Sequence, residues 1–301
     1  MNDNRRSREA LGLRTFFDEQ LHHLQKLAGG VGAYIHEKDR RTRQERQIIE
    51  SFVDASNSKM RAVQGYSERL REHVQVLYHH VLKVADEIPP PVNLDLNAFN
   101  TNPLINALFV NGKDIDKLVK IDLDVDAYLR THGKYQIPVL YALLTACRSE
   151  KRTLGMGMQG DVLIREVWQQ TVNFSAHKLH EPCADEMELN TALKTYLFDR
   201  VTTLVKQEMM SRPPHPSFKP DKSYESRIKS LANPDVYLDQ LIEHLKTPSK
   251  LLSMDKIHFR LSKLGVELDD GDRQCANEFD VHELDWGNNI RNVVLQIAHV
   301  R

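Results

Sequence analysis

The sequence predicts an α+β fold that is predominantly α-helical, with a long N-terminal helical module, a mixed central domain and a small C-terminal antiparallel β-sheet. Three observations lead to this prediction. An apolar seam with heptad spacing covers residues 49–88, two proline-rich segments interrupt the chain, and period-two alternation appears near the C-terminus. We therefore expect modules at residues 1–88, 92–211 and 221–301.

The composition indicates a globular chain of 301 residues, of which 41% are hydrophobic and 28% charged, enough for about two domains. Lys plus Arg number 41 and Asp plus Glu 42, so the formal net charge is 41 − 42 = −1. This balance argues against a protein whose main activity is to bind nucleic-acid phosphates. The odd cysteine number favours a reduced, cytoplasmic setting. The cysteines are Cys147, Cys183 and Cys275.

The first module begins with a predicted amphipathic helix over residues 9–28, followed by three glycines that stop it or form a hinge. The next segment, between Lys38 and Arg46, is helix-prone and is the most basic window of the chain. It fits a contact with nucleic acid or an acidic partner, but interleaved acidic residues favour a solvated helix face.

The seam itself predicts one continuous helical rod about 60 Å long over residues 49–88. A lone helix is marginal in water, so another helix or a second copy of the chain must cover this stripe. Aromatic and small residues flank the seam, which favours a helical bundle or hairpin over a two-stranded coiled coil. The residues that we select as the interaction face are Val53, Met60, Val63, Leu70, Val74, Leu77 and Val81.

The central module predicts short helices over residues 100–110 and 114–119, and a third that Asp126 caps and that runs through Arg130. Pro138 is expected to open a further helix. The core face of that helix would carry Leu140, Leu143, Leu144 and Cys147.

The next part of the central module leaves two secondary structures open. Residues 162–170 fit a helix or a strand equally well. A helix from Ala184, capped by Asp185 and Glu188, is predicted to continue to about Met210.

Two motifs in this module could carry chemistry. Gly155, Gly157 and Gly160 fit a phosphate-binding glycine pattern, but no strand is predicted before them, so a glycine-rich turn is favoured. A second group of zinc-ligand types follows, with a spacing that matches no standard site, so we expect no metal and no cofactor. This second group is His177, His180 and Cys183.

The last module predicts helices over residues 223–231 and 234–245. Ile257, Phe259 and Leu261 then alternate with polar residues, which is typical of a half-buried strand. A final hairpin is predicted on either side of residues 287–289.

These features favour a non-enzymatic interaction or scaffold protein of the cytoplasm. It would self-associate or dock a protein partner through the long helix or the edge of the C-terminal sheet. Two alternatives stay open: an enzyme of unrecognised class that uses the Gly155–Gly160 loop or the histidine–cysteine group, and a nucleic-acid-associated factor that uses the basic window. The longest apolar run, residues 139–144, is too short to span a bilayer, so no membrane contact is expected.

Overall fold

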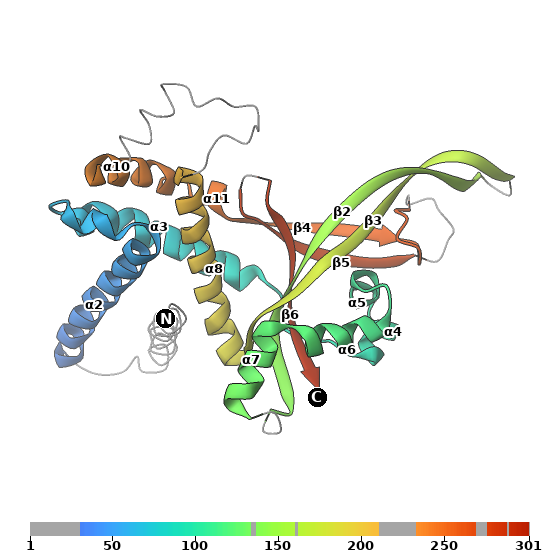
Figure 1. Ribbon diagram of the computed structural model, residues 1–301, viewed down its shortest axis with the longest axis horizontal. Helices are drawn as coiled ribbons and strands as arrows, with labels where there is room; N and C mark the ends of the chain where they lie inside the picture. Colours follow the sequence, from blue (N-terminus) through green and yellow to red (C-terminus); the bar gives the residue numbers. More distant parts are fainter. Residues whose placement is uncertain are drawn as a thin grey trace. The chain divides into compact units, whose positions relative to one another are not determined.

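A computed structural model describes most of the chain, which forms two compact units (Figure 1). Unit 1 consists of the described residues of Met1–Ala85 and Thr191–Leu252, and unit 2 of those of Asp86–Asn190 and Ser253–Arg301. The described residues are 31–133, 137–159, 162–210, 233–268, 276–287 and 289–300. The helices predicted over residues 9–28 and 223–231 lie outside them.

Unit 1 is built from helices that bury one shared core. Its elements are α2 (Val31–Ser56), the 3-10 helix η1 (Ser58–Ala62), α3 (Tyr66–Glu87), most of α8 (Glu186–Met210), α10 (Pro234–Leu245) and α11 (Pro248–Leu251). The ring of Phe198 on α8 lies 6.2 Å from that of Phe52 on α2 and 5.8 Å from that of Tyr78 on α3. This aromatic contact ties three helices together, and burial raises the pKa of the Tyr78 hydroxyl far above its usual value.

The predicted single rod is wrong, because the seam is divided between α2 and α3. Ser56 is buried and its hydroxyl donates to the carbonyl of Phe52 at 2.7 Å, a bond that competes with continued helix. Asn57 then takes an extended conformation and its side chain accepts from the backbone N–H of Lys59. Gly65 has φ +72°, a left-handed conformation that glycine adopts easily. Heptad spacing therefore continues across a break in the helix.

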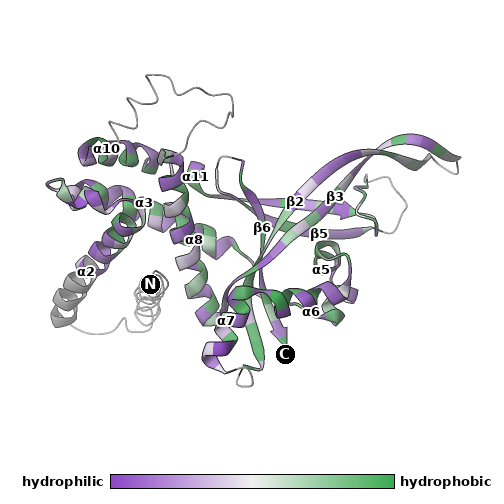
Figure 2. Cartoon of the chain, viewed as in Figure 1, coloured by the Kyte–Doolittle hydropathy of each residue, from purple (hydrophilic) through white to green (hydrophobic). Residues whose placement is uncertain are grey.

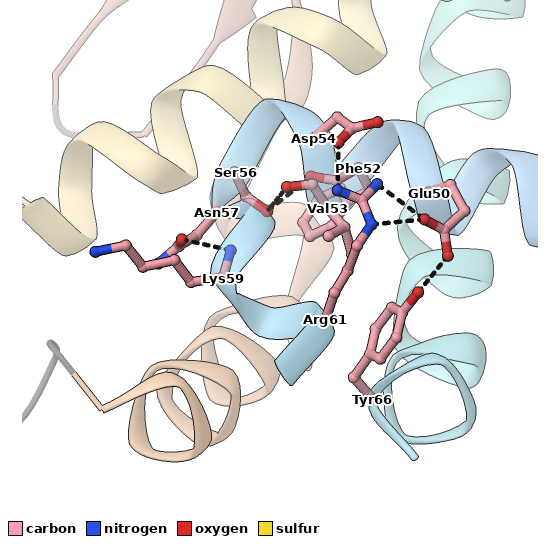
Figure 3. A network of polar contacts seen from close by, with 9 residues as sticks. All are labelled: Glu50, Phe52, Val53, Asp54, Ser56, Asn57, Lys59, Arg61 and Tyr66. Carbon is pink, nitrogen blue, oxygen red and sulfur yellow. Dashed lines mark hydrogen bonds and ion pairs between the residues drawn. The ribbon is translucent and has the colours of Figure 1, made fainter. Parts of the chain in front are cut away.

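A polar network holds the corner where the two helices meet (Figure 3). The guanidinium of Arg61 lies 2.8 Å from Glu50 and 2.7 Å from Asp54, and the hydroxyl of Tyr66 donates to Glu50 at 2.5 Å. These bonds raise the pKa of Arg61 and of the Tyr66 hydroxyl. The network thus links α2, the residues after it and the start of α3.

Unit 2 is organised around a six-stranded sheet. Its strands are β1 (Val92–Asn93), β2 (Val139–Gln159), β3 (Val162–Cys183), β4 (Ser253–Leu261), β5 (Asn277–Asp285) and β6 (Arg291–Val300). The order is β3-β2-β6-β5-β4 with antiparallel neighbours, and β1 pairs with β6 in parallel. The predicted β5–β6 hairpin and the α10 helix are confirmed.

The predicted fold class is wrong, because the sheet is neither small nor confined to the C-terminal part. Strand β2 begins at Val139, where a helix after Pro138 was predicted, and it pairs with β6 from Val139 to Ala146. Both Leu143 and Leu144 are fully or almost fully buried, so this stretch of β2 is covered on both faces. A strand buried on both faces shows no alternation, and its apolar run therefore resembles a helix.

The hairpin of β2 and β3 is long and curved (Figure 1). Its register shifts at three places, and at each of them β3 contains one residue more than β2. Each shift contains one β3 residue with positive φ: Glu166, Ala176 and Glu181. Bulges of this kind bend a strand and increase its twist, which accounts for the curvature. The region 162–170, left open between helix and strand, is strand.

Four short helices cover one face of the sheet, which we call its inner face. They are α4 (Leu96–Thr101), α5 (Pro103–Leu108), α6 (Gly112–Ile121) and α7 (Leu123–His132), and each has an Asn or Asp N-cap. The cap of α7 is Asp122 rather than the predicted Asp126, and its other carboxylate oxygen accepts from the N–H of Leu179 on β3. One carboxylate therefore fixes both the helix start and its place on the sheet.

The sheet curls around its inner face, so that the region after β4 at one edge meets β3 at the other edge. The turn after β4 returns to β3, where Val172 N–H donates to Gly265 O at 2.8 Å and Glu267 N–H donates to Gln170 O at 2.8 Å. The ring of Phe174 on β3 packs edge-on against that of Phe259 on β4, with centroids 6.4 Å apart. The order of strands thus describes an open sheet, but one end is closed by a turn.

A buried ion pair crosses the space inside this curl. Arg148 of β2 donates two hydrogen bonds, at 3.1 and 2.9 Å, to the carboxylate of Glu283 on β5. The side chains are 15% and 2% exposed, and the guanidinium also contacts Glu150 and the ring of Phe259. The bidentate geometry compensates for the cost of burying both charges.

Replacing Arg148 with Met should lower the free energy of unfolding by about 3–5 kcal/mol, because Glu283 would stay buried without its partner. The double variant Arg148→Met/Glu283→Leu should regain most of this loss. Urea unfolding measures both. The exposed pair of Arg130 and Asp126 on α7 gives the control, since Arg130→Met should cost only about 0.5 kcal/mol. Equal losses in the single and double variants would contradict the assignment.

Candidate interaction surface on the β2–β3 hairpin

The seven residues predicted as an interaction face are all buried inside unit 1. Their exposed fractions lie between 0 and 9%. The helices of this chain cover the seam, so a partner would reach it only if the unit opened. The use of these residues for binding stays a prediction. The residues are Val53, Met60, Val63, Leu70, Val74, Leu77 and Val81.

The basic window and the glycine motif do not form recognisable sites. The window lies on α2, where Arg43 and Arg46 are exposed; the side chains before residue 42 lie outside the description. Gly155 and Gly157 lie within β2, paired with Val167 and Ile164 of β3. A phosphate-binding glycine motif has its glycines in a loop, with a helix or a second strand after it, whereas Gly155 and Gly157 are paired within a strand. Gly160 lies outside the described residues.

The three residues of the histidine–cysteine group lie in three different environments on β3. His180 hydrogen-bonds the Thr145 hydroxyl at 3.0 Å, and the buried thiol of Cys183 donates to the carbonyl of Tyr141. His177 stacks on the ring of Phe109 instead. Within the described part of the chain, no group of three or more His, Cys, Asp or Glu side chains could hold a metal ion.

The His177 ring forms part of the wall of a cavity of about 560 Å³ between β3 and α6. Its centroid lies 4.6 Å from that of Phe109, and its buried Nε2 has no hydrogen-bond partner among the described residues. Burial lowers the pKa of His177, while the carbonyl of Leu108 and the charge of Asp114 act in the opposite direction. The imidazole is therefore held neutral in a largely apolar contact.

The outer hairpin, which we define as the described residues of 150–169, differs from the rest of the sheet. Strand β6 pairs with β2 only as far as Ala146, and the turn after β4 meets β3 at residues 170–172. Beyond these points the outer hairpin consists of two strands. A two-stranded ribbon is marginally stable by itself, so this part of β2 and β3 has edges that another chain could cover.

An apolar patch lies on this outer hairpin. Trp168, Met156 and Leu154 are 69%, 61% and 56% exposed. Leu154 lies directly opposite Trp168, and Met156 is two residues further along β2, so the three share one face. We call these three residues the hairpin patch. Figure 2 shows hydrophobic colouring on the outer part of the hairpin, beyond a more hydrophilic middle part.

The charges on the same face as the hairpin patch are mainly positive. Arg165 lies opposite Met156, and Arg152 precedes Leu154 by two residues. Glu150, next along this face, already accepts from Gln170 and pairs with Arg148. The patch is therefore flanked by two arginines. Trp, Met and Arg are the residue types that protein interfaces favour.

Sequence reasoning missed this surface, although its signal was present. The Gly155 region was not paired with residues 162–170, because neither segment was assigned to a strand. A strand pairing of the two would have placed Trp168 opposite Leu154. Gly155 has no side chain, so the side chain of Gln169 lies across it. Its Nε2 donates to the carbonyl of Met156 at 2.9 Å.

Comparisons with models of protein families, with curated proteins and with solved structures find no match for this chain. In the part of the chain that the structure describes, no helix has the length and apolar character needed to cross a membrane.

The pKa of His177 has a consequence for stability that can be measured. Because the pKa of His177 is lower in the folded chain, the folded chain binds fewer protons at this residue than the unfolded chain as the pH falls through about 6.5, so stability falls with the pH. His282 acts in the same direction. Between pH 7.5 and 5.5, the variant His177→Phe should lose less of its free energy of unfolding than the wild type, as measured by urea unfolding.

The control for this measurement is His132→Phe. His132 stacks on Tyr128 much as His177 stacks on Phe109, but its side chain is exposed. The control should follow the pH dependence of the wild type. If His177→Phe does the same, the buried ring does not set the pH dependence of unit 2.

Proposed function

We propose that this chain is a non-enzymatic interaction protein that docks a protein partner through the hairpin patch. The observation that carries the proposal is the exposure of Trp168, Leu154 and Met156 together on one face of a two-stranded ribbon. Large apolar side chains grouped in this way are typical of binding surfaces, whereas scattered ones are ordinary.

The charge around the patch defines the kind of partner. Arg152 and Arg165 flank it, so the partner surface should offer aliphatic or aromatic side chains next to carboxylates. The net charge of −1 argues against nucleic acid as the main ligand, even though Trp168 offers a ring for base stacking. A cytoplasmic location belongs to this proposal, and the thiol of Cys147, which is exposed and forms no disulfide, supports it.

The enzyme alternative has less support. In the described residues, His177, His180 and Cys183 each contact a different structural neighbour, and Gly155 and Gly157 lie in a strand. His180 does contact the Thr145 hydroxyl, but Thr145 is only 7% exposed, so a substrate has little access to that hydroxyl.

The test is a double variant, Leu154→Ser/Trp168→Ser, in the full chain. Protein captured from the native cell should be quantified for wild type and variant by mass spectrometry, and the Kd then measured with the purified partner. Loss of an anchor tryptophan costs at least about 2 kcal/mol at an interface, so the Kd should rise roughly 30-fold or more. The thermal midpoint should not change, because both side chains are exposed.

Thr153→Ser is the matched control, because Thr153 is exposed on the same strand but on the opposite face. It should leave the Kd unchanged. Two outcomes would overturn the proposal. In the first, the double variant retains every partner; in the second, the surface binds single-stranded DNA with an affinity that falls steeply with salt and is lost on charge reversal at Arg152 and Arg165.

A further inference from the structure

A second cavity, of about 680 Å³, lies where the curled sheet closes. Its walls come from α4 and α5, from residues 172–174 of β3, from the turn after β4 and from the first residue of β5. Its volume falls within the range of small-molecule sites, and the mouth of a curled sheet is a common location for them. None of the features singled out in the sequence pointed to this place.

The turn that forms one wall is rigidly attached to the sheet. Gly265 has φ +74°, and a Cβ at this position would lie 2.8 Å from the carbonyl oxygen of Val172. The Ser262 N–H donates to Val266 O at 2.8 Å, and its hydroxyl accepts from the N–H groups of Leu264 and Val266. The backbone therefore meets β3 directly, and the wall exists before any ligand arrives.

A pair of amides forms the opposite part of the lining. Asn277 Nδ2 donates to Asn106 Oδ1 at 3.1 Å, and Asn106 Nδ2 donates to the carbonyl of Phe99 at 3.1 Å. Each side-chain amide has two N–H donors and an oxygen that accepts two bonds, so the bonds to described residues leave donors and an acceptor of the pair available. These groups are complementary to another amide.

The described part of the lining carries a positive charge. Lys263, at the exposed edge of the turn, is the one charged side chain among the described lining residues, and it forms no ion pair with any described residue. Among the described residues that line the cavity there is no Asp or Glu. The floor contains the apolar side chains of Phe174 and Leu261, which suit an aliphatic group.

We propose that this cavity binds a small ligand with one carboxylate, one amide and a short aliphatic side chain, as in an N-acyl amino acid or the last residue of a peptide. The carboxylate pairs with Lys263, the amide bonds Asn106 and Asn277, and the aliphatic group lies on Phe174. This site is separate from the hairpin patch and does not depend on it.

The probe is N-acetyl-L-leucine, titrated into the full chain while the side-chain amide signals of Asn106 and Asn277 are followed by NMR. A saturable shift of both signals at millimolar concentrations is expected. Lys263→Ala should raise the Kd about tenfold, and N-acetyl-L-leucinamide should bind wild type about tenfold more weakly than the acid. Lys263→Arg should restore binding, and Lys113→Ala, an exposed lysine outside the lining, should leave it unchanged.

The peptide acetyl-Ala-Ala-Leu distinguishes the two sources of the ligand: tighter binding than N-acetyl-L-leucine indicates a peptide end, and weaker binding a free N-acyl amino acid. The absence of a saturable shift with either probe would overturn the proposal. So would equal affinity for the acid and the amide, or full competition by inorganic phosphate. The Leu154→Ser/Trp168→Ser variant should bind the probe normally, so failure here and failure of the docking proposal are distinguishable.

Discussion

The pairing of β2 with β6 is the constraint on which the architecture of unit 2 depends. Over Val139–Ala146 it joins a strand from the middle of the chain to the last strand that the structure describes. This pairing anchors one half of the β2–β3 hairpin in a covered sheet and leaves the other half outside it. The same pairing also places β1 on the other side of β6, so that Val92 is opposite Ile297.

Two different kinds of interaction then hold the curled sheet together. On the inside, Arg148 and Glu283 connect β2 to β5 across the core, where a charge without a partner would be costly. At the closed end, backbone hydrogen bonds connect Gly265 and Glu267 to β3. Between them lies the packing of Phe174, Phe259 and Phe279. The cavity lined by Asn277 lies beside this closed end, and the outer hairpin begins beyond the point where the pairing of β2 with β6 stops.

Local chemistry was predictable from the sequence, and long-range pairing was not. Asp185 and Glu188 cap α8 as expected, with Glu188 N–H donating to Asp185 at 2.7 Å and Glu188 accepting from the N–H of Ala184. The β5–β6 turn also followed from its Gly-Asn-Asn segment. One local prediction, the Asp126 cap, was wrong because Asp122 caps α7 instead. The larger failures, the predicted rod and the helix after Pro138, share one cause: periodicity reports which residues are buried, not what buries them. Leu140, Leu143 and Leu144 are buried on a strand, and the buried seam residues are divided among α2, η1, α3 and the residues between and after them. The hairpin patch escaped notice because its members are adjacent only after β2 and β3 pair.

The pairing of β1 and β2 with β6 determines when unit 2 can fold during synthesis. Val92 and Ile297 are about 200 residues apart in the chain, and β2 meets β6 over a separation of about 150. Contacts of such long range make folding slow, and they cannot form on the ribosome until the final strand has emerged. Until then the apolar edge of β2 has no neighbour. Residues 139–146 therefore gain their second neighbouring strand only after β6 has been synthesised.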